Sequence, residues 1–242
     1  MLLRVPLPPT LGARSFADLT RALAGVVDDV AREPEVRVVA LVGTPGVFCR
    51  GMDLGEMVEA GAARASLAAF AEIVARLRRL GRPTLAVVDG DAVGGGVGLA
   101  AACDVVIAST RATFALPEAL LGLLPGVVLP VLLERLSRQS ARQLALAGAS
   151  RDAAWALARG LADEVAEPAD LERLVRRRAR EFRRVPTKGV VGVRRWLSEL
   201  EDMRTDAGLA AGAELTASLI DEPVTRASVR AFLDEGVAPW QA

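Results

Sequence analysis

Short apolar runs alternate with amphipathic stretches along the first half of the chain. Residues 36–42 are almost continuously apolar and rich in β-branched side chains, a pattern typical of a strand buried on both faces. Residues 15–32 instead repeat apolar side chains with a helical period, and Ser15 can cap the first turn. The first half is therefore expected to alternate between strands and helices.

The same two periodicities predict elements along the rest of the chain. The predicted strands and extended pieces are 36–42, 84–88, 104–108 and 112–115. The predicted helices are 15–32, 65–80, 96–102, 125–136, 140–146, 150–159, 168–184, 187–200, 207–219 and 223–235. Residues 48–54 are predicted to form a loop. The alternation followed by helices alone predicts an α/β core over 1–185 and a C-terminal helical region over 186–242.

Composition narrows the class of protein. The chain has 242 residues and 52% apolar side chains, but no apolar run nears the ~18 residues that span a membrane. The N-terminus lacks the pattern of a signal peptide, so we expect a cytoplasmic enzyme with no membrane partner. With 30 basic and 30 acidic residues the net charge is zero, which argues against a nucleic-acid partner.

Two residue types are missing altogether. The chain contains no His and no Tyr, which excludes Ser-His-Asp catalysis, Cys-His catalysis and a His-ligated zinc site within one chain. Cys49 and Cys103 have neither metal-site nor disulfide spacing, and each is predicted to be a small core residue. Without His or Tyr, acid–base chemistry must rest on Asp, Glu, Lys, Cys or water, and we expect no metal and no cofactor.

A glycine run lies between a predicted strand and a predicted helix. It comprises Gly94, Gly95 and Gly96, with Gly98 two residues later, and it lacks the G-x-G-x-x-G spacing of a dinucleotide site. Backbone N–H groups at such a helix start can hold developing negative charge. A tight strand-to-helix turn that needs glycine for its backbone geometry is the alternative.

Glu118 follows Leu116 and Pro117 at the start of a predicted helix. Its apolar neighbours suggest burial, which would raise its pKa, whereas a helix N-terminus would lower it. An ordinary acidic residue favoured by the helix dipole is the alternative. Taken with the glycine run, Glu118 suggests chemistry on a carbonyl that becomes an enolate.

Arginines gather at two places on predicted helices. Each group is either a solvated helix face or a patch for an acidic partner. The first group comprises Arg76, Arg78, Arg79 and Arg82, and the second comprises Arg173, Arg176, Arg177, Arg178, Arg180, Arg183 and Arg184.

The order of these motifs resembles the enoyl-CoA hydratase/isomerase (crotonase) superfamily over about residues 15–165. The motifs are Phe48-Cys49-Arg50-Gly51-Met52-Asp53-Leu54, the glycine run, Cys103-Asp104 and Leu116-Pro117-Glu118. The resemblance implies a crotonase-like fold of repeated ββα units, with the C-terminal helical region forming a homotrimer or a dimer of trimers.

The resemblance also implies roles for individual residues. Backbone N–H groups at Met52 and Gly95 would hold a thioester oxygen, and Glu118 would correspond to the second of two family glutamates. The position of the first glutamate is Gly98, a departure from the hydratase pattern. The residues implied in substrate binding are Phe48, Cys49, Arg50, Gly94, Gly96, Gly98 and Leu116.

Three stretches are similar to one subgroup, the crotonase-like dehydratases of polyketide β-branching. They are 95–98, 116–125 and 128–130. The subgroup removes water from a 3-hydroxy-3-methylglutaryl unit on an acyl carrier protein, which implies a lyase. Three alternatives stay open: an enoyl-CoA hydratase, a 3,2-enoyl-CoA isomerase, and a non-catalytic scaffold. The carrier (coenzyme A or carrier protein) and the second proton donor also stay open.

Overall fold

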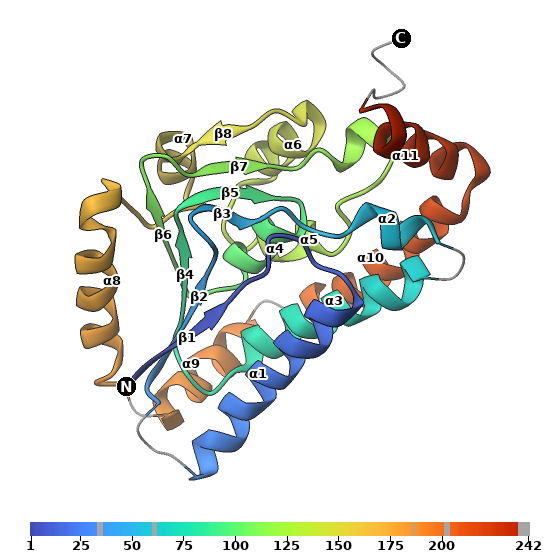
Figure 1. Cartoon of the computed structure of the whole chain (residues 1–242). Coiled ribbons are helices and arrows are strands. Elements are labelled where there is room, and N and C mark those ends of the chain that lie inside the picture. The colour runs from blue at the N-terminus through green and yellow to red at the C-terminus, as the bar shows by residue number, and fades with distance from the viewer. Residues whose placement is uncertain (33–35, 60–61, 186, 201–203, 237–242) are drawn as a thin grey trace.

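The computed structural model describes residues 1–32, 36–59, 62–185, 187–200 and 204–236. Two β-sheets lie in the middle of the molecule, with α8 on one side and most other helices on the opposite side (Figure 1). Over the described ranges, no helix combines the length and apolarity that crossing a membrane requires.

The first sheet has five parallel strands in the order β1-β2-β4-β6-β9. Its central strands β2, β4 and β6 are almost entirely apolar because both of their faces are covered. The strands are β1 (Leu2–Pro6), β2 (Val38–Val42), β4 (Thr84–Val88), β6 (Val105–Ser109) and β9 (Glu164–Ala166).

The second sheet has four strands in the order β3-β5-β7-β8, and only the β7–β8 pair is antiparallel. Three of its strands each follow a strand of the first sheet after a short turn and lead into a helical segment. This repetition confirms the predicted ββα units. The strands are β3 (Gly46–Cys49), β5 (Gly90–Val93), β7 (Thr113–Ala115) and β8 (Arg151–Asp152).

Helical segments follow the strand pairs and then make up most of the C-terminal half. Those of the first half are α1 (Ala13–Arg32), α2 (Leu54–Val58), α3 (Ala62–Arg79), α4 (Gly95–Ala101) and the 3₁₀ turn η1 (Glu118–Leu121). Those of the second half are α5 (Val128–Leu132), α6 (Arg138–Ala147), α7 (Ala153–Arg159), α8 (Pro168–Phe182), α9 (Thr187–Leu200), α10 (Arg204–Asp221) and α11 (Pro223–Glu235).

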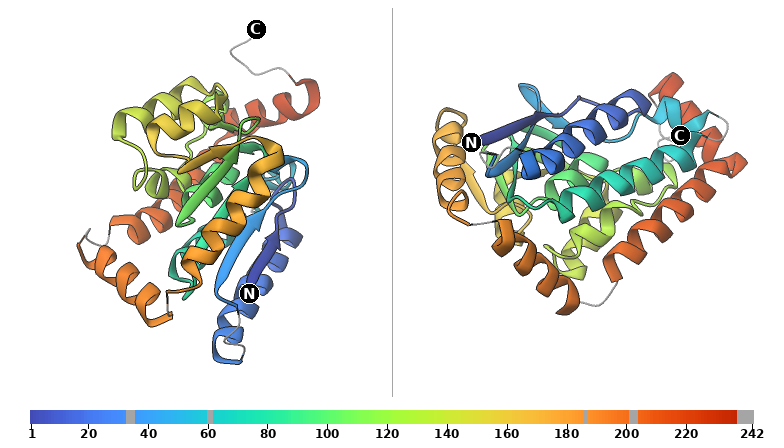
Figure 2. Two further views of the ribbon diagram at one scale, coloured as in Figure 1. Left: turned by 90° about the vertical axis from the view of Figure 1, so that its left-hand side faces the viewer. Right: turned by 90° about the horizontal axis from the view of Figure 1, so that it is seen from below.

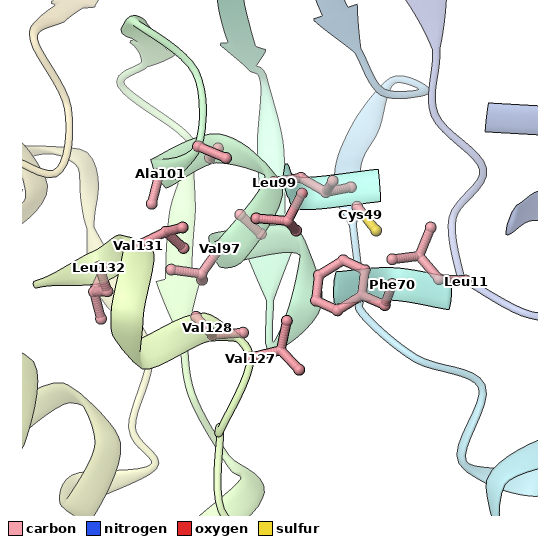
Figure 3. Close-up of a cluster of buried hydrophobic side chains, with 14 of the residues drawn as sticks. Leu11, Cys49, Phe70, Val97, Leu99, Ala101, Val127, Val128, Val131 and Leu132 are labelled. Atoms are coloured by element: carbon pink, nitrogen blue, oxygen red, sulfur yellow. The ribbon is translucent and has the colours of Figure 1, made fainter. Parts of the chain in front are cut away.

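Alternation along the strands divides the core in two. On β2, Val39 and Leu41 face the larger core that contains α3, α4 and α5, whereas Val38 and Ala40 face α8. The left view of Figure 2 shows α8 lying across that second face of the sheet. In the larger core, Phe70 of α3 lies among side chains of α4 and of 127–132 (Figure 3).

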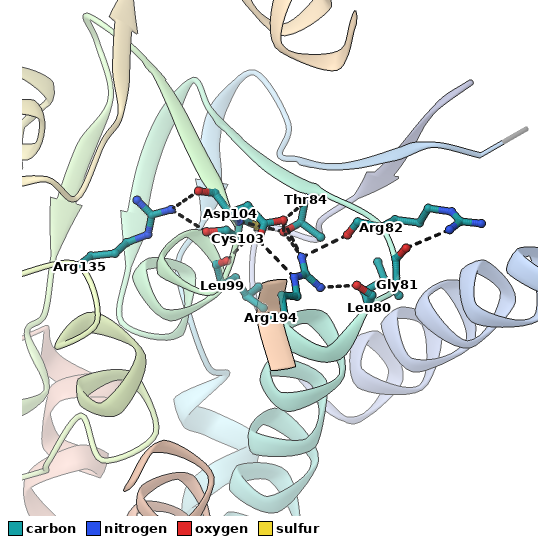
Figure 4. Close-up of polar contacts among 9 residues, drawn as sticks. All are labelled: Leu80, Gly81, Arg82, Thr84, Leu99, Cys103, Asp104, Arg135 and Arg194. Atoms are coloured by element: carbon teal, nitrogen blue, oxygen red, sulfur yellow. Dashed lines mark hydrogen bonds and ion pairs between the residues drawn. The ribbon is translucent and has the colours of Figure 1, made fainter. Parts of the chain in front are cut away.

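A polar network holds α9 against the ends of two strands (Figure 4). The Asp104 carboxylate accepts hydrogen bonds from the Thr84 backbone N–H at 2.6 Å and the Thr84 hydroxyl at 2.9 Å. Arg194 of α9 pairs with the same carboxylate at 2.6 Å. Arg135 donates to the backbone oxygens of Cys103 at 2.6 Å and Asp104 at 3.0 Å. Charge-assisted bonds of this kind are stronger than neutral ones.

Some predicted elements differ from those observed. β1, β5, β8 and β9 were not predicted, and most of them are short or start at glycine. Residues 48–54, predicted as a loop, contain the end of β3 and the start of α2. The predicted helix 125–136 contracts to α5, because Gly126 lies in a loop packed on α10.

Helix α10 packs backbone to backbone against the loop that follows η1. A Cβ on Gly126 would lie 2.6 Å from the Gly212 backbone oxygen, and one on Gly212 would overlap the Gly126 carbonyl. The Thr216 hydroxyl donates to the Leu124 backbone oxygen at 3.1 Å in the same contact. The C-terminal region is therefore locked to the segment that carries Glu118.

Replacing Gly212 with Ala should destabilise the protein. A methyl group cannot fit without moving backbone, and overpacking of this kind costs roughly 1–3 kcal/mol. Gly208→Ala on the same helix is the control, because its nearest neighbours are ring atoms of Pro130, 3.2 Å and 3.4 Å away. The measurement is chemical denaturation of both variants. Equal free energies of unfolding would contradict the backbone contact.

Candidate active site

The first candidate donor is the backbone N–H of Met52, in the loop after β3. The Leu11 N–H donates to the Gly51 oxygen, and the Asp53 N–H donates to the Leu11 oxygen, both at 2.8 Å. Successive groups of an extended segment point to opposite sides, so the Met52 N–H points away from Leu11. Gly51 has a φ of 82°, which only glycine adopts readily.

The second candidate donor is the N–H of Gly95, in the first turn of α4. A Cβ on Gly51 would lie 2.9 Å from the Gly95 nitrogen, so the loop after β3 touches this turn directly. A Cβ on Gly96 would overlap the Cys49 carbonyl oxygen, so that contact also requires glycine. Within the described residues, neither the Met52 N–H nor the Gly95 N–H has a hydrogen-bond acceptor. The two donors are thus close together and free to hold an anionic oxygen.

Glu118 lies beside this pair of donors. Strand β7 and Pro117 deliver it to the start of η1, and a Cβ on Gly94 would lie 2.9 Å from its Oε1. Gly94 is fixed there because its N–H donates to the Ala115 oxygen at 2.9 Å, with a φ of 53°. The carboxylate therefore lies against the residue that precedes the Gly95 donor.

Burial dominates the electrostatics of Glu118. Its Oε2 is fully covered and has no hydrogen-bond partner in the described part of the chain. Burial raises the pKa of this carboxyl from 4.5 to about 7, and a hydrogen bond with its own backbone offsets only part of the rise. Of the two opposing effects expected from the sequence, desolvation is the larger. Near neutral pH Glu118 can either take or give a proton.

The wall beside Gly98 is apolar. A Cβ on Gly98 would lie 3.1 Å from a methyl group of Val128 and 3.4 Å from the tip of the Phe70 ring. Both of these side chains are buried. The position that the family resemblance assigns to a first glutamate therefore holds no carboxylate and faces hydrocarbon.

The structure places the other predicted site residues in two environments. Phe48, Cys49 and Leu116 have side chains 1% exposed or less, so only their backbone could contact a substrate. Burial raises the pKa of the Cys49 thiol to about 11, in keeping with a structural role. Cys103 is also buried, as predicted. Arg50 is exposed and pairs with Asp91 at 3.1 Å.

Neither arginine group forms an unpaired basic surface beside the candidate site. In the first group, Arg76 pairs with Glu72, Arg78 pairs with Glu134, and Arg82 is buried on backbone oxygens. The second group lies on α8 and just after its end, and α8 packs on the opposite face of the sheet from α4.

On α8 itself, several arginines have carboxylate partners. Arg173, Arg176, Arg177 and Arg178 are all in ion pairs. A groove of about 270 Å³ between β1 and α8 is lined in part by Arg176, Arg180 and Arg183. It is separated from Glu118 by the sheet.

Two contributors to the site were not identified from the sequence. Phe70 carries no motif, and only its place on the apolar stripe of α3 could have suggested burial. Leu11 positions the Met52 donor through backbone bonds alone, which leave no sequence signal. Over the described ranges, no group of three or more His, Cys, Asp or Glu side chains could hold a metal ion.

Comparison with known proteins finds several that are similar to this chain. The bacillaene synthase dehydratase PksH of Bacillus subtilis (strain 168) is 30% identical over 210 residues, covering 85% of this chain and 80% of the relative. The 2,3-dehydroadipyl-CoA hydratase of Escherichia coli (strain K12) is 29% identical over 238 residues, covering 97% and 92%. The crystal structure of PksH from Bacillus subtilis, a polyketide biosynthesis enoyl-CoA hydratase, superposes with a TM-score of 0.88 at 26% identity over 98% of this chain and 95% of that one.

The fold and the match to a family model define a crotonase-type enzyme that acts on acyl thioesters. The enoyl-CoA hydratase/isomerase family model matches residues 9–242, and the chain belongs to that family. Its relatives make it a lyase of the hydratase and dehydratase kind.

The raised pKa of Glu118 predicts a pH-dependent stability. Because the folded-state pKa of about 7 is above the ordinary 4.5, the unfolded chain releases this proton first as the pH rises. The protonated carboxyl makes its full contribution to the free energy of unfolding below pH 4.5. This contribution is lost progressively up to about pH 7. Glu118→Gln cannot ionise, so its melting temperature relative to the parent should increase over that interval and then level off.

Scanning calorimetry from pH 4 to 8.5 measures this difference. Glu59→Gln, at an exposed position near the first donor loop, controls for the loss of a carboxylate as such. A Glu118→Gln difference that is constant across the interval would contradict the raised pKa.

Proposed function

We propose that this enzyme dehydrates a 3-hydroxyacyl thioester, with a 3-hydroxy-3-methylglutaryl unit as substrate and a 3-methylglutaconyl unit as product, in polyketide β-branching. The observation that carries the proposal is the Glu118 carboxylate, whose covered Oε2 has no partner in the described residues, beside two backbone donors. The likeness to a bacillaene synthase dehydratase supports this substrate class.

In the proposed mechanism the N–H groups of Met52 and Gly95 bind the thioester oxygen. They stabilise the enolate that forms when Glu118 removes the α-proton. A preorganised donor of this kind is worth roughly 3–4 kcal/mol in other enzymes. The β-hydroxyl group then leaves as water, with its added proton supplied by Glu118 or by a bound water. No metal is needed for any of these steps, because the negative charge develops on an oxygen already facing two donors.

The carrier is proposed to be an acyl carrier protein. Carrier proteins present an acidic surface, and the sequence suggested that one of the two arginine groups would meet it. The contacts of those arginines do not favour either group, since one is internally paired and the other lies behind the sheet. Support for a carrier protein therefore rests on the polyketide relative, and coenzyme A is the competing carrier.

A 3,2-enoyl-CoA isomerase is the second candidate. It needs one carboxylate to move one proton between two carbons, and Gly98 leaves this chain with one family glutamate. The two functions differ in product, since only the dehydratase releases water. Mass spectrometry of the products formed from both substrates by one preparation distinguishes the two functions.

Glu118→Gln should abolish turnover while thioester binding is retained. The amide keeps the shape of the side chain but removes its basicity, and losing a general base costs about 10²–10⁴-fold in rate. The measurement is single-turnover dehydration of carrier-bound 3-hydroxy-3-methylglutaryl substrate, read by mass spectrometry. Glu59→Gln is the matched control and should retain the parent rate. A Glu118→Gln rate within about threefold of the parent, far from that range, would refute the mechanism.

A trimer is proposed for the assembled enzyme, with the C-terminal region between subunits. On α9, Val191, Val193 and Leu197 are 47%, 61% and 55% exposed. Apolar side chains gathered on one element favour a protein contact. Trp196 and Leu200 are further apolar residues of this helix, and their side chains lie outside what the structure describes.

Val193→Glu combined with Leu197→Glu should therefore dissociate the assembly. Light scattering at micromolar concentration should give about three times 25.4 kDa for the parent and a smaller mass for the variant. Leu146→Glu on α6 is the control, because Leu146 is also exposed, at 68%, but lies on another helix. A parent that is already monomeric would contradict the proposal.

A further inference from the structure

A third group of arginines lies on α6, β8 and α7, where no sequence motif marks it. Between positions 136 and 160 the chain has four arginines and a single acidic residue, Asp152, although the whole chain has no net charge. The arginines are Arg138 and Arg142 of α6, Arg151 of β8 and Arg159 of α7, and together they are called the α6–α7 basic patch. The segment that contains them has a net charge of +3.

The acidic residues in and beside this segment are engaged elsewhere. Asp152 caps α7 by accepting a backbone N–H at 2.7 Å. Glu134, just before the segment, pairs with Arg78, and Asp163, just after it, pairs with Arg135. Over the described ranges, no carboxylate of this chain therefore forms an ion pair with an arginine of the α6–α7 basic patch.

The arginines of the patch have few partners of any kind. Within the part of the chain that the structure describes, the side chains of Arg138 and Arg142 have neither a hydrogen-bond acceptor nor an ion-pair partner, and both are exposed. The covered Nε of Arg151 also has no acceptor there. Arg159 donates to the Ser140 hydroxyl at 3.1 Å rather than to a carboxylate. An acidic partner would supply the charged acceptors that arginine binds most strongly.

Apolar surface accompanies this charge. Trp155 of α7 is half-buried, and the guanidinium carbons of Arg151 and Arg159 each lie 5.8 Å from the centre of one of its rings. Leu146 lies one helical turn after Arg142 on the same face of α6 and is 68% exposed. Tryptophan and arginine are enriched among the residues that dominate binding at protein interfaces. The patch therefore suits a protein surface that is acidic and partly apolar.

The patch adjoins the segment that carries Glu118. Strand β8 pairs with β7 and places Arg151 opposite Phe114, four residues before Glu118. Helix α6 packs against η1, and a Cβ on Gly148, at the end of α6, would overlap the Leu120 side chain. Figure 1 shows α6, β8 and α7 together beside β7. A protein bound to the patch would thus lie next to η1, at whose start Glu118 stands.

We propose that the α6–α7 basic patch is the docking surface for the acyl carrier protein that delivers the substrate. Carrier proteins present an acidic surface, and complementary charge steers and aligns association. Docking beside η1 leaves the flexible arm of the carrier to bring the thioester to the Met52 and Gly95 donors. The other two arginine groups are internally paired or lie behind the sheet. This inference rests on the proposed dehydratase function.

Charge reversal on α6 tests the proposal. Arg138→Glu combined with Arg142→Glu should raise KM for a 3-hydroxy-3-methylglutaryl unit on a purified acyl carrier protein by about tenfold or more, because like charges would then face each other. The value of kcat should not change. The same unit on pantetheine, which brings no carrier surface, should be turned over as by the parent, and this also shows that the variant is folded.

Arg180→Glu combined with Arg183→Glu is the matched control. It makes the same change of charge at two exposed arginines, on α8 and just after its end, on the opposite face of the sheet. Its KM for the carrier-bound unit should equal that of the parent. Because salt screens exposed charges, raising the ionic strength should increase the parent's KM for the carrier-bound unit and change that of the α6 variant much less.

Several results would count against the docking surface. An unchanged KM for the carrier-bound unit in the α6 variant would overturn it, and so would an equal rise for the pantetheine-bound unit or in the α8 control. A rise as large with the coenzyme A thioester would assign the patch to the phosphates of coenzyme A instead. Light scattering completes the test, since a smaller mass for the α6 variant than for the parent would assign the patch to a contact between subunits and refute carrier docking.

The parent enzyme separates this inference from the function on which it rests. A parent that dehydrates neither the carrier-bound nor the pantetheine-bound unit contradicts the proposed function, and the docking surface falls with it. If the parent dehydrates both units and charge reversal on α6 changes neither KM, the dehydratase stands and only the docking surface is overturned.

Discussion

The first turn of α4 lies against the backbone at the end of β3, with no side chain between them. Gly51, Gly95 and Gly96 meet there, and a Cβ at position 51 or 96 would collide with backbone atoms. This contact brings together two N–H groups from segments more than forty positions apart in the chain. Hydrogen bonds to Leu11 on one side and to Ala115 on the other keep each segment in place.

The chemistry then depends on what surrounds those donors. Burial of Glu118 desolvates its carboxyl, and this desolvation raises the pKa of that group to about 7. The same burial that makes the carboxyl useful near neutral pH costs stability once it ionises. Packing of α10 on Gly126 holds the segment against that cost. The packing of the C-terminal region thus helps the fold to tolerate the ionisation of the buried Glu118 carboxyl.

Sequence patterns predicted the parts of this account that leave local signals. The apolar run of β2 and the amphipathic helices α3 and α11 are predicted by their periodicity. Glu118 and the glycine run were identified because their residue types suit the chemistry.

Other features depend on tertiary contacts that leave no such signal. Strand β5 starts at Gly90, whose φ of 151° lets the Gly46 backbone approach. β8 is only two residues long and gains its strand geometry by pairing with Phe114. The partners of Arg78 and Arg177 could not be foreseen either, because Glu134 and Glu164 are brought to them only by the fold.

The central claim is that the Met52 and Gly95 N–H groups together polarise a thioester carbonyl beside Glu118. Infrared difference spectroscopy of a ¹³C=O-labelled, non-reactive acyl thioester bound to the enzyme measures that polarisation directly. Two hydrogen bonds to the oxygen predict a carbonyl band shifted to lower frequency than in water. Gly95→Pro, which removes one donor, should reverse part of the shift. A bound thioester with its carbonyl band at the frequency seen in water would contradict the account.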